Sequence, residues 1–388
     1  MKHVNFTERK FPKPTSGEKL DYTAESEAAL VWSAITEGDD IEASRIIDQY
    51  GYAAALEKLK SADSSIISES AQERWFNRLA YAQLAPLESY TQRGYSLVLR
   101  DSENWPSGLA DLGERRPLCL WVYGDPEALA NPMIGIVGSR DATSEGARSA
   151  LDLAYELAQE YVIVSGGAYG IDAQAHRGAL LAERPTVIVS AAGVDRVYPK
   201  QNLEIFQRCV ENGGAVVSES IPGAAPHRHR FLLRNRIIAA ISKVVIVVEA
   251  GLRSGALNTA RHALEIGREV GAFPGSVCAP QCAGTNHLIR NGATLVMNTD
   301  HVRELAGAIG SANTITGVES DGGFTIPLDD EFDPLANRIY DVLSKVRYEP
   351  ADIIAHRVGC DVVSVRMKLN RLTLAGRIVI KDGKWRKA

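Results

Sequence analysis

The chain of 388 residues is poor in the features that define several large protein classes. Its five cysteines are scattered along the sequence and form no compact framework of the kind that staples small secreted domains, which indicates a reduced, cytoplasmic protein. The apolar runs reach the length of a strand but not that of a membrane span. The polar amino terminus has no apolar segment of a secretory signal. We therefore expect a globular protein without a membrane partner.

The sequence also lacks the signatures of common catalysts. There is no P-loop lysine motif, which argues against ATP hydrolysis, and no G-x-S-x-G nucleophile elbow. Cys278 and Cys282 lie near His287, but a zinc site needs more ligands at a better spacing. The full G-x-G-x-x-G pattern is missing, and no acidic ribose clamp follows the first glycine turn, so NAD is not expected. We predict no catalytic residue, no metal and no cofactor.

The chain has no overall excess of positive charge, because 48 acidic residues outnumber its 43 lysines and arginines and the net charge is -5. Any contact with nucleic acid must therefore come from a local patch. The densest patch lies in the stretch HRHRFLLRNRIIAAISKVVIVVEA, residues 227–250, and its four arginines surround one phenylalanine. An apolar run that is typical of a buried strand follows directly. The stretch thus places cations at the edge of a hydrophobic core.

Patterns of composition divide the chain into five segments. Residues 1–20 are polar and proline-bearing, which predicts a disordered arm. Residues 21–95 carry short apolar runs at helical spacing, which predict a small all-helical domain. Strand-like runs alternate with helical stretches over 96–307, so we predict an α/β core with a doubly wound, mostly parallel Rossmann-like sheet. A linker rich in Gly, Ser and Asp over 308–332 leads to a final compact domain at 333–388.

The alternation in the core can be stated segment by segment. Strands are expected over 134–137, 162–164, 187–189, 215–217, 244–248, 270–273 and 294–296. Helices are expected over 145–160, 171–181, 203–211, 231–241 and 256–266.

The final domain reads as three helices followed by a hairpin with an Asp382-Gly383 turn. Three helices and a hairpin predict a winged helix, which is a variant of the helix-turn-helix. Its last helix places basic residues such as Arg366 and Lys368 largely off the apolar face. Domains of this kind bind nucleic acid or serve as protein-contact modules, so both interpretations stay open.

Three glycine turns follow strands of the predicted sheet: Gly138-Ser139-Arg140, Gly166-Gly167 and Ser254-Gly255. Ligands bind such sheets at the carboxyl ends of the strands, where helix amino termini point N–H groups outward. Arg140 adds a bidentate phosphate donor. Three such turns along one sheet edge suit a nucleotide or a run of phosphates. Asp172, four residues before His176, is expected to support a helix start rather than catalysis.

Together these stretches resemble the DNA processing protein A family, also called DprA or Smf. The similarity runs nearly continuously from about residue 95 to 300 and includes IGIVGSR, IVSGGAYGIDAQAHRG, YPKQN, HRHRFLLRNRIIAAIS and EAGLRSGALNTARHALE. Members often carry a SAM-like helical domain at the amino terminus, and many carry a winged helix at the carboxyl terminus. One departure is Leu232, where the family usually has proline, and this difference bears on where the helix after Phe231 begins.

The resemblance implies a Rossmann-like core that binds single-stranded DNA without enzymatic turnover. It further implies a homodimer that helps to load the RecA recombinase during natural transformation. The complete set of expected DNA-binding residues, from the resemblance and the glycine turns, is Gly138, Ser139, Arg140, Gly166, Gly167, Lys200, Arg228, Arg230, Phe231, Arg234, Asn235, Arg236, Ser254 and Gly255.

The arginine stretch fits this function physically. Non-specific single-strand binding needs cations along a groove and an aromatic face on which a base can stack. Phe231 supplies the aromatic face, Arg228 and Arg230 are expected just before a helix, and Arg234 is expected one turn inside it. One or two of the arginines, Arg236 or Arg230 first, are expected to form structural salt bridges instead.

Two other functions stay open. The glycine turns also resemble those of LOG-type nucleotide phosphoribohydrolases, which would make the protein a nucleotide-binding or nucleotide-hydrolysing enzyme. The glutamate that this chemistry needs after Thr259 is missing. The third hypothesis is a duplex-DNA regulator that acts through the winged helix.

Overall fold

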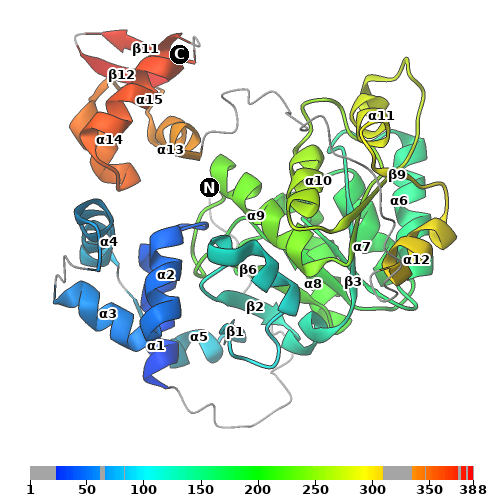
Figure 1. Ribbon diagram of the computed structural model, residues 1–388, viewed down its shortest axis with the longest axis horizontal. Coiled ribbons are helices and arrows are strands. Elements are labelled where there is room, and N and C mark those ends of the chain that lie inside the picture. The colour runs from blue at the N-terminus through cyan, green and yellow to red at the C-terminus, as the bar shows by residue number, and fades with distance from the viewer. Residues whose placement is uncertain are drawn as a thin grey trace, which may run out of the picture.

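The computed structural model describes residues 23–61, 66–82, 84–308, 334–345, 347–374, 377–381 and 383–387. The predicted arm lies outside these residues, and so does the predicted linker apart from its first residue. Figure 1 shows a group of helices near the amino terminus, a central sheet covered by helices, and a small domain at the carboxyl terminus. None of the helices in the described part of the chain has the length and hydropathy needed to cross a bilayer.

The central sheet of the described chain has the strand order β1-β2-β6-β5-β4-β3-β7-β8-β9. Its strands are β1 (Tyr95–Val98), β2 (Leu120–Gly124), β3 (Met133–Val137), β4 (Val162–Ser165), β5 (Thr186–Val189), β6 (Ala215–Ser218), β7 (Val244–Val247), β8 (Glu269–Ala272) and β9 (Thr294–Leu295). From β6 to β9 all neighbouring strands are parallel, whereas β2 runs antiparallel to β6 and to β1. The prediction of a mostly parallel sheet is confirmed, and every expected strand is present.

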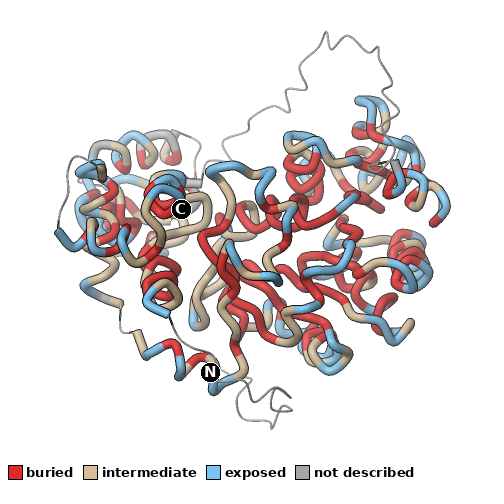
Figure 2. The backbone as a smooth tube through the Cα atoms, turned by 60° about the horizontal axis from the view of Figure 1, so that its bottom comes forward, coloured by how far each residue is buried: buried red, intermediate tan, exposed pale blue. Residues whose placement is uncertain are grey.

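Helices cover both faces of the sheet, as expected for a doubly wound fold. The helices are α6 (Ser144–Leu157), α7 (Ile171–Leu181), α8 (Leu203–Glu211), α9 (Arg228–Ile241), α10 (Gly255–Glu265), α11 (Ala283–Arg290) and α12 (Thr299–Ala308). One core cluster joins α9, α10 and α11 to side chains such as Val137 and Val247. A second joins α6, α7 and α12 to side chains such as Ile134 and Ile246, and a third includes α7 and α8. Alternate strand residues thus face opposite helical layers. Figure 2 shows the buried strands between these layers.

Helix α9 begins at Arg228, three residues before the predicted start, with His227 as its N-cap. Arg228 and Arg230 therefore lie in the first turn of the helix and not before it, so that part of the prediction is wrong. Leu232 explains the difference, because leucine keeps the backbone N–H that proline lacks and lets regular helical bonding pass through this position. The arginines consequently share one rigid helix with Phe231.

The amino-terminal helices are α1 (Ala24–Ile35), α2 (Ile41–Tyr50), α3 (Tyr52–Lys60), α4 (Glu69–Tyr81) and α5 (Leu87–Thr91). The side chains of Thr23, Asp40 and Ser68 cap α1, α2 and α4 by accepting backbone N–H groups, which explains these helix starts. Trp32 and Trp75 meet edge to face in the domain core, with ring centroids 5.2 Å apart. This core also contains Leu99, Leu118 and Cys119, so its packing crosses the predicted boundary at residue 95.

The carboxyl-terminal domain has three helices and a three-stranded antiparallel sheet of order β10-β12-β11. Its elements are α13 (Pro334–Val342), β10 (Glu349–Pro350), α14 (Ala351–Val358), α15 (Val362–Leu374), β11 (Ile378–Lys381) and β12 (Lys384–Lys387). Gly359 ends α14 in the left-handed conformation at φ 64°, as predicted for a helix stop. Ile339, Val365, Leu369 and Trp385 belong to a core of its own. The expected three helices and hairpin are present.

Candidate nucleic-acid interface

A cleft of about 720 Å³ opens at the carboxyl end of the sheet. Its walls are the turn after β3, the residues around the start of α7, α9 from Arg228 to Ile238, and the amino end of α10, with Tyr198 beside them. Nine of the expected DNA-binding residues line it: Gly138, Ser139, Arg140, Arg228, Phe231, Arg234, Asn235, Ser254 and Gly255. The three chain segments that carry them are far apart in sequence, so the fold brings together most of the predicted set. We call this feature the cleft.

Helix α9 presents one face to the cleft. Arg228, Phe231, Leu232, Asn235 and Ile238 line the cleft at spacings of three and four residues, which places them on one side of the helix. The Asn235 side chain fixes the neighbouring wall, because its Nδ2 donates to the backbone carbonyl of Gly255 at 3.2 Å. The cleft wall is therefore a rigid helix face tied to the start of α10.

Phe231 lies in an aromatic and cationic setting. Its ring centroid is 5.4 Å from that of Tyr198, and the guanidinium of Arg140 lies 5.3 Å from its centroid. Tyr198 is 47% exposed, and Phe231 is partly exposed. Aromatic rings next to a cation form a stacking platform for unpaired bases that does not depend on sequence. The predicted aromatic contact is thus placed in the cleft.

Tyr198 was missed from the sequence, whereas Lys200 of the same YPKQN motif was chosen. Lys200 is exposed at the start of a short 3-10 helix and does not line the cleft. The YPKQN motif therefore contributes Tyr198 to the cleft and not Lys200. The sequence signal for Tyr198 is that it is aromatic and lies in the same motif as Lys200. An aromatic ring such as Phe231 packs favourably against a second ring.

Two exposed arginines complete the cationic lining. Arg140 and Arg253 are exposed, and neither forms an ion pair within the described chain. Arg253 was also missed, although it lies in the third glycine turn next to Ser254. In that turn the Ser254 hydroxyl caps α10 by accepting the Ala256 N–H, and the first turn of α10 has no acidic residue. The amino end of α10 and the two arginines therefore offer positive potential to an anion.

Arg234 lies deep at the base of the cleft and is only 4% exposed. Its Nη1 donates to the carbonyl of Val189 at 2.6 Å, and its Nε has no hydrogen-bond partner within the described chain. Burial lowers the pKa of Arg234 to about 10 despite the neighbouring carboxyl of Asp172. A cation held this far from water supplies a strong local field to a ligand in the cleft.

Gly166 makes the buried position of Arg234 possible. A Cβ added at residue 166 would collide with the Arg234 guanidinium, so only glycine leaves the necessary space. Gly166 and Gly167 are both buried, and neither lines the cleft. The second glycine turn therefore reaches the cleft through Ala168 and not through the two predicted glycines. Its contribution is to make room for Arg234.

The turn after β3 also differs from the prediction of outward N–H groups. The Ser139 N–H donates to the carbonyl of Glu249 at 2.7 Å, and the Thr143 N–H donates to the Glu249 carboxylate at 2.9 Å. The Thr143 side chain caps α6. The Ser139 N–H is thus taken by a backbone carbonyl, and a carboxylate of the protein already occupies the start of α6, so the expectation of outward N–H groups at this turn is wrong. Gly138, Ser139 and Arg140 still line the cleft.

Asp172 and His176 do not form a pair. Asp172 is buried in the first turn of α7, as expected, but it does not cap the helix, because its carboxylate accepts the Ala168 N–H of the preceding turn at 3.4 Å. Burial raises the pKa of Asp172, partly offset by Arg234. His176 is fully buried, its Nδ1 lies 2.8 Å from the Thr186 hydroxyl, and burial lowers its pKa to about 3. His176 is therefore a neutral core residue.

Arg230 and Arg236 bind carboxylates outside the cleft. The Nε and Nη2 of Arg230 donate to the two oxygens of Glu37 at 2.9 and 2.8 Å. Arg236 has no exposed surface and donates to both oxygens of Glu219 at 2.8 and 2.7 Å. The expectation of structural salt bridges from these two arginines is confirmed. The structure does not bring either of them to the cleft, although both were predicted DNA contacts.

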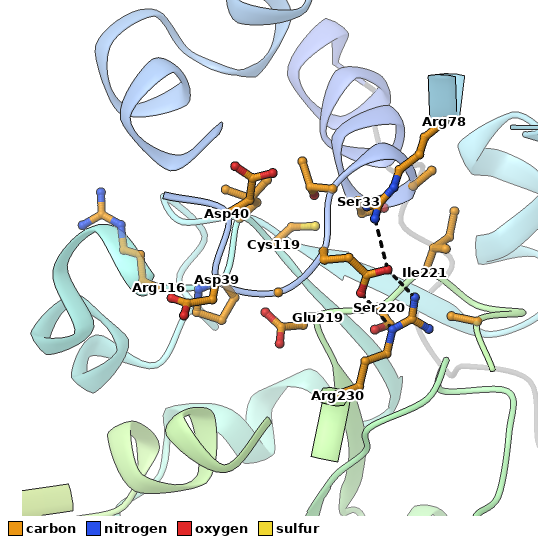
Figure 3. A pocket seen from close by; sticks show the side chains of 17 residues that line it. Ser33, Asp39, Asp40, Arg78, Arg116, Cys119, Glu219, Ser220, Ile221 and Arg230 are labelled. Atoms are coloured by element: carbon orange, nitrogen blue, oxygen red, sulfur yellow. Dashed lines mark hydrogen bonds and ion pairs between the residues drawn. The ribbon is translucent and has the colours of Figure 1, made fainter. Parts of the chain in front are cut away.

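These ion pairs lie at the junction between the amino-terminal helices and the core. Here a cavity of about 90 Å³ is lined by residues that include Glu37, Arg78, Glu219 and Arg230. Figure 3 shows Arg78 and Arg230 pointing toward the same carboxylate. Burial opposes ionisation of Glu37, but the hydrogen bond from His229 and the charge of Arg230 hold its pKa well below the usual value. We call this region the junction.

Comparison with known proteins agrees with the geometry. Residues 96–307 match the model of the DNA recombination-mediator protein A family. The chain is 35% identical over 380 residues to a Mycobacterium tuberculosis protein that carries the DprA name, covering 95% of each chain. It is 42% identical over 207 residues to DNA processing protein DprA of Streptococcus pneumoniae, covering 53% of this chain and 71% of the relative.

Two solved structures are similar over the core. DNA processing protein A from Streptococcus pneumoniae superposes with a TM-score of 0.61 at 30% identity, covering 73% of this chain and 98% of that one. The Helicobacter pylori protein superposes with a TM-score of 0.50 at 31% identity, covering 56% and 96%, and its structure describes a single-stranded DNA binding mode of that protein. From its sequence and its fold, the chain belongs to the DNA recombination-mediator protein A family.

Proposed function

We propose that the protein binds single-stranded DNA in the cleft without sequence preference and without catalytic turnover. The observation that carries this proposal is the arrangement around Phe231. Its ring packs against the ring of Tyr198 and against the guanidinium of Arg140, which together form an aromatic and cationic surface for an unpaired base. Arg253 and the amino end of α10 add positive potential along the same wall. The single-stranded DNA binding described for the Helicobacter pylori relative supports the assignment.

The finer role follows from the family description as a recombination mediator. We propose that the protein acts as a cytoplasmic homodimer that helps to load the RecA recombinase onto the bound strand during natural transformation. A non-specific groove suits this role, because a mediator must accept any incoming sequence. Co-sedimentation of the recombinase with protein-coated oligonucleotide would test the hand-off, and analytical ultracentrifugation would test the dimer.

We also propose domain identities for the two ends of the chain. The order of helices and strands from α13 to β12 supports a winged helix, and the position of α1 to α5 supports a SAM-like domain. Duplex-DNA regulation through the winged helix remains the alternative function for that domain. A preference for duplex over single strand that disappears on removal of residues 333–388 would support it.

The direct test is fluorescence anisotropy of labelled oligo-dT, single-stranded against duplex, with Phe231→Ala. Loss of the stacking face should weaken single-strand binding by about 1–3 kcal/mol. Tyr155→Ala is the matched control, because Tyr155 is 47% exposed on α6 and does not line the cleft. Equal affinity of both variants, or a preference of the wild-type protein for duplex, would remove the cleft as the single-strand site.

Nucleotide binding is the second candidate function, because the cleft volume lies in the range of small-molecule pockets. Buried Arg234 and the amino end of α10 would hold a phosphate of a mononucleotide in the same place as a phosphate of a strand. Incubation with nucleoside monophosphates separates the possibilities. Release of free base would show the LOG-like hydrolysis, whereas binding without release would show a nucleotide sensor.

A further inference from the structure

The amino end of α9 is covered by the carboxyl-terminal domain. The backbone N–H of Arg228 donates to the carboxylate of Asp341 in α13 at 3.0 Å. The Nδ1 atom of His229 lies 3.7 Å from the same carboxylate oxygen. Figure 1 shows α13 on the side of the core where α9 begins, and the two helices are in contact. A domain from the far end of the chain thus supplies the anion at this helix start.

The position is a favourable one for an anion. Helix α9 is 14 residues long, has no acidic residue in its first turn, and has no side-chain cap from His227. Its first N–H groups and its dipole therefore attract negative charge from elsewhere. His229 is only 4% exposed, and its Nδ1 has no hydrogen-bond partner within the described chain. Because the Asp341 oxygen lies 3.7 Å from Nδ1, beyond hydrogen-bond distance, the docked carboxylate satisfies this buried nitrogen incompletely.

The covered position is continuous with the cleft. Arg228 lines the cleft with its side chain, while its backbone N–H is held by Asp341. A phosphate that leaves the cleft past Arg228 would meet the Asp341 carboxylate within the same first turn of α9. Two anions cannot share these donors without strong repulsion. The carboxylate and the DNA backbone therefore compete for the same groups.

The docked domain is held by polar contacts rather than by a shared core. Its hydrophobic cluster is separate from the clusters of the rest of the chain, so its fold does not depend on docking. The turn at Gly359 packs against Arg74 and Arg78 of α4. Arg338 of α13 adds positive charge close to Arg78, which opposes docking electrostatically. Such an interface can open when an anion replaces Asp341.

We propose that the carboxyl-terminal domain is an internal competitor of DNA, with Asp341 occupying a phosphate subsite at the amino end of α9 until a bound strand displaces it. This inference rests on single-strand binding in the cleft and adds a further subsite and its regulation. A strand confined to the cleft leaves the domain docked. A longer strand that passes Arg228 releases it.

The first test is the Asp341→Asn variant, which keeps the side-chain shape and removes the competing charge. We expect it to bind long oligo-dT about three- to tenfold more tightly than the wild-type protein, since one charge contact at a helix start no longer has to be displaced. Asp352→Asn is the matched control, because it removes one exposed acidic charge from α14 of the same domain. Equal affinity of the two variants would overturn the competition.

Hydrogen–deuterium exchange of the full-length wild-type protein separates this inference from the function on which it rests. Adding long oligo-dT should slow exchange in the part of α9 that lines the cleft and speed exchange in α13. Absence of protection in α9 would overturn single-strand binding in the cleft, and the competition with it. Protection in α9 together with unchanged or slower exchange in α13 would leave the binding function standing and overturn the competition alone.

Discussion

The cleft and the junction use the same residue type in opposite ways. In the cleft, Arg140 and Arg253 are exposed and form no ion pair within the described chain. At the junction, Arg230 and Arg236 each donate two hydrogen bonds to one carboxylate, and their side chains are largely or wholly buried. A dense run of arginines in a sequence is therefore no measure of the charge offered to a ligand. The measure is which of them lack a carboxylate partner.

Helical geometry and the carboxylate partners together make the division within α9. Residues that differ by three or four positions share a helix face, and those that differ by two lie on different faces. Arg228 and Phe231 accordingly share the cleft face. Arg230 and Arg236 lie at the edges of that face, four residues from the cleft-lining Arg234 and Leu232, and their carboxylate partners Glu37 and Glu219 hold them outside the cleft. One helix thus carries cleft-lining residues, an ion pair to the amino-terminal helices through Arg230, and an ion pair within the core through Arg236.

The largest effect is expected from breaking the buried pair at the junction. Glu219→Gln leaves the guanidinium of Arg236 without its charge partner in a place with no exposed surface. An uncompensated buried charge should lower the free energy of unfolding by about 3–5 kcal/mol, measured by urea denaturation. Glu114→Gln is the control, because its pair with Arg45 is exposed to solvent and should contribute little to stability. Equal losses would contradict the distinction between buried and exposed pairs.

The second-largest expected effect is a pH-dependent loss of stability when Glu37 is replaced. Its pKa is lowered below the usual 4.5, so its ion pairs contribute stability above pH 4.5 and lose it as pH falls through the lowered pKa. We expect Glu37→Gln to cost about 2–3 kcal/mol at pH 7. The difference from the wild-type protein should shrink steadily in urea denaturations below pH 4.5. A difference that does not depend on pH would show that the charge of Glu37 is not the source of stability.

A smaller loss is expected from filling the space beside Arg234. Gly166→Ala places a methyl group where the guanidinium lies, so either Arg234 or the strand end must move. Overpacking of this kind costs about 1–2 kcal/mol of unfolding free energy and should also weaken single-strand binding, because the buried cation is displaced. Gly307→Ala is the control, since a Cβ there meets nothing within 4 Å. Unchanged DNA affinity in Gly166→Ala would separate Arg234 from the binding site.

The smallest effect is a change in salt dependence. Arg140→Ala and Arg253→Ala should each reduce the slope of log affinity against log salt by about 0.7, because each removes one phosphate contact with a single strand. Arg184→Ala should leave the slope unchanged, because Arg184 is exposed outside the cleft and donates to Gln159. Anisotropy titrations over a salt series measure all three. A slope lowered equally by Arg184→Ala would mean that general surface charge drives binding.

Much of the fold was predictable because it depends on local pattern. Buried apolar runs predicted the parallel strands β3 to β7, and Asp382-Gly383 predicted the final hairpin. Strands β1 and β2 were missed because an antiparallel edge pair joined by a 3-10 helix breaks the alternation of strand and helix. The apolar run over 118–123 was the available signal for β2.

The site was predictable where residue type alone decides the chemistry, as for Arg140 and Phe231. It was not predictable where a partner from another segment decides. Glu249 closes the helix start behind Ser139, and Glu219 neutralises Arg236, although neither contact leaves a trace in local spacing. Helical periodicity does not separate Arg236 from the cleft either, because Arg236 follows the cleft-lining Leu232 by four residues.

The absence of a side chain at residue 166 limits which substitutions positions 166 and 234 can accept during evolution. Arg234 fits only above a glycine, and a glycine at 166 without Arg234 would leave an empty space beneath the cleft. Each position therefore penalises a change at the other. The two positions are 68 residues apart in the sequence and should co-vary. A tolerated double substitution would need a larger residue at 166 together with a shorter one at 234.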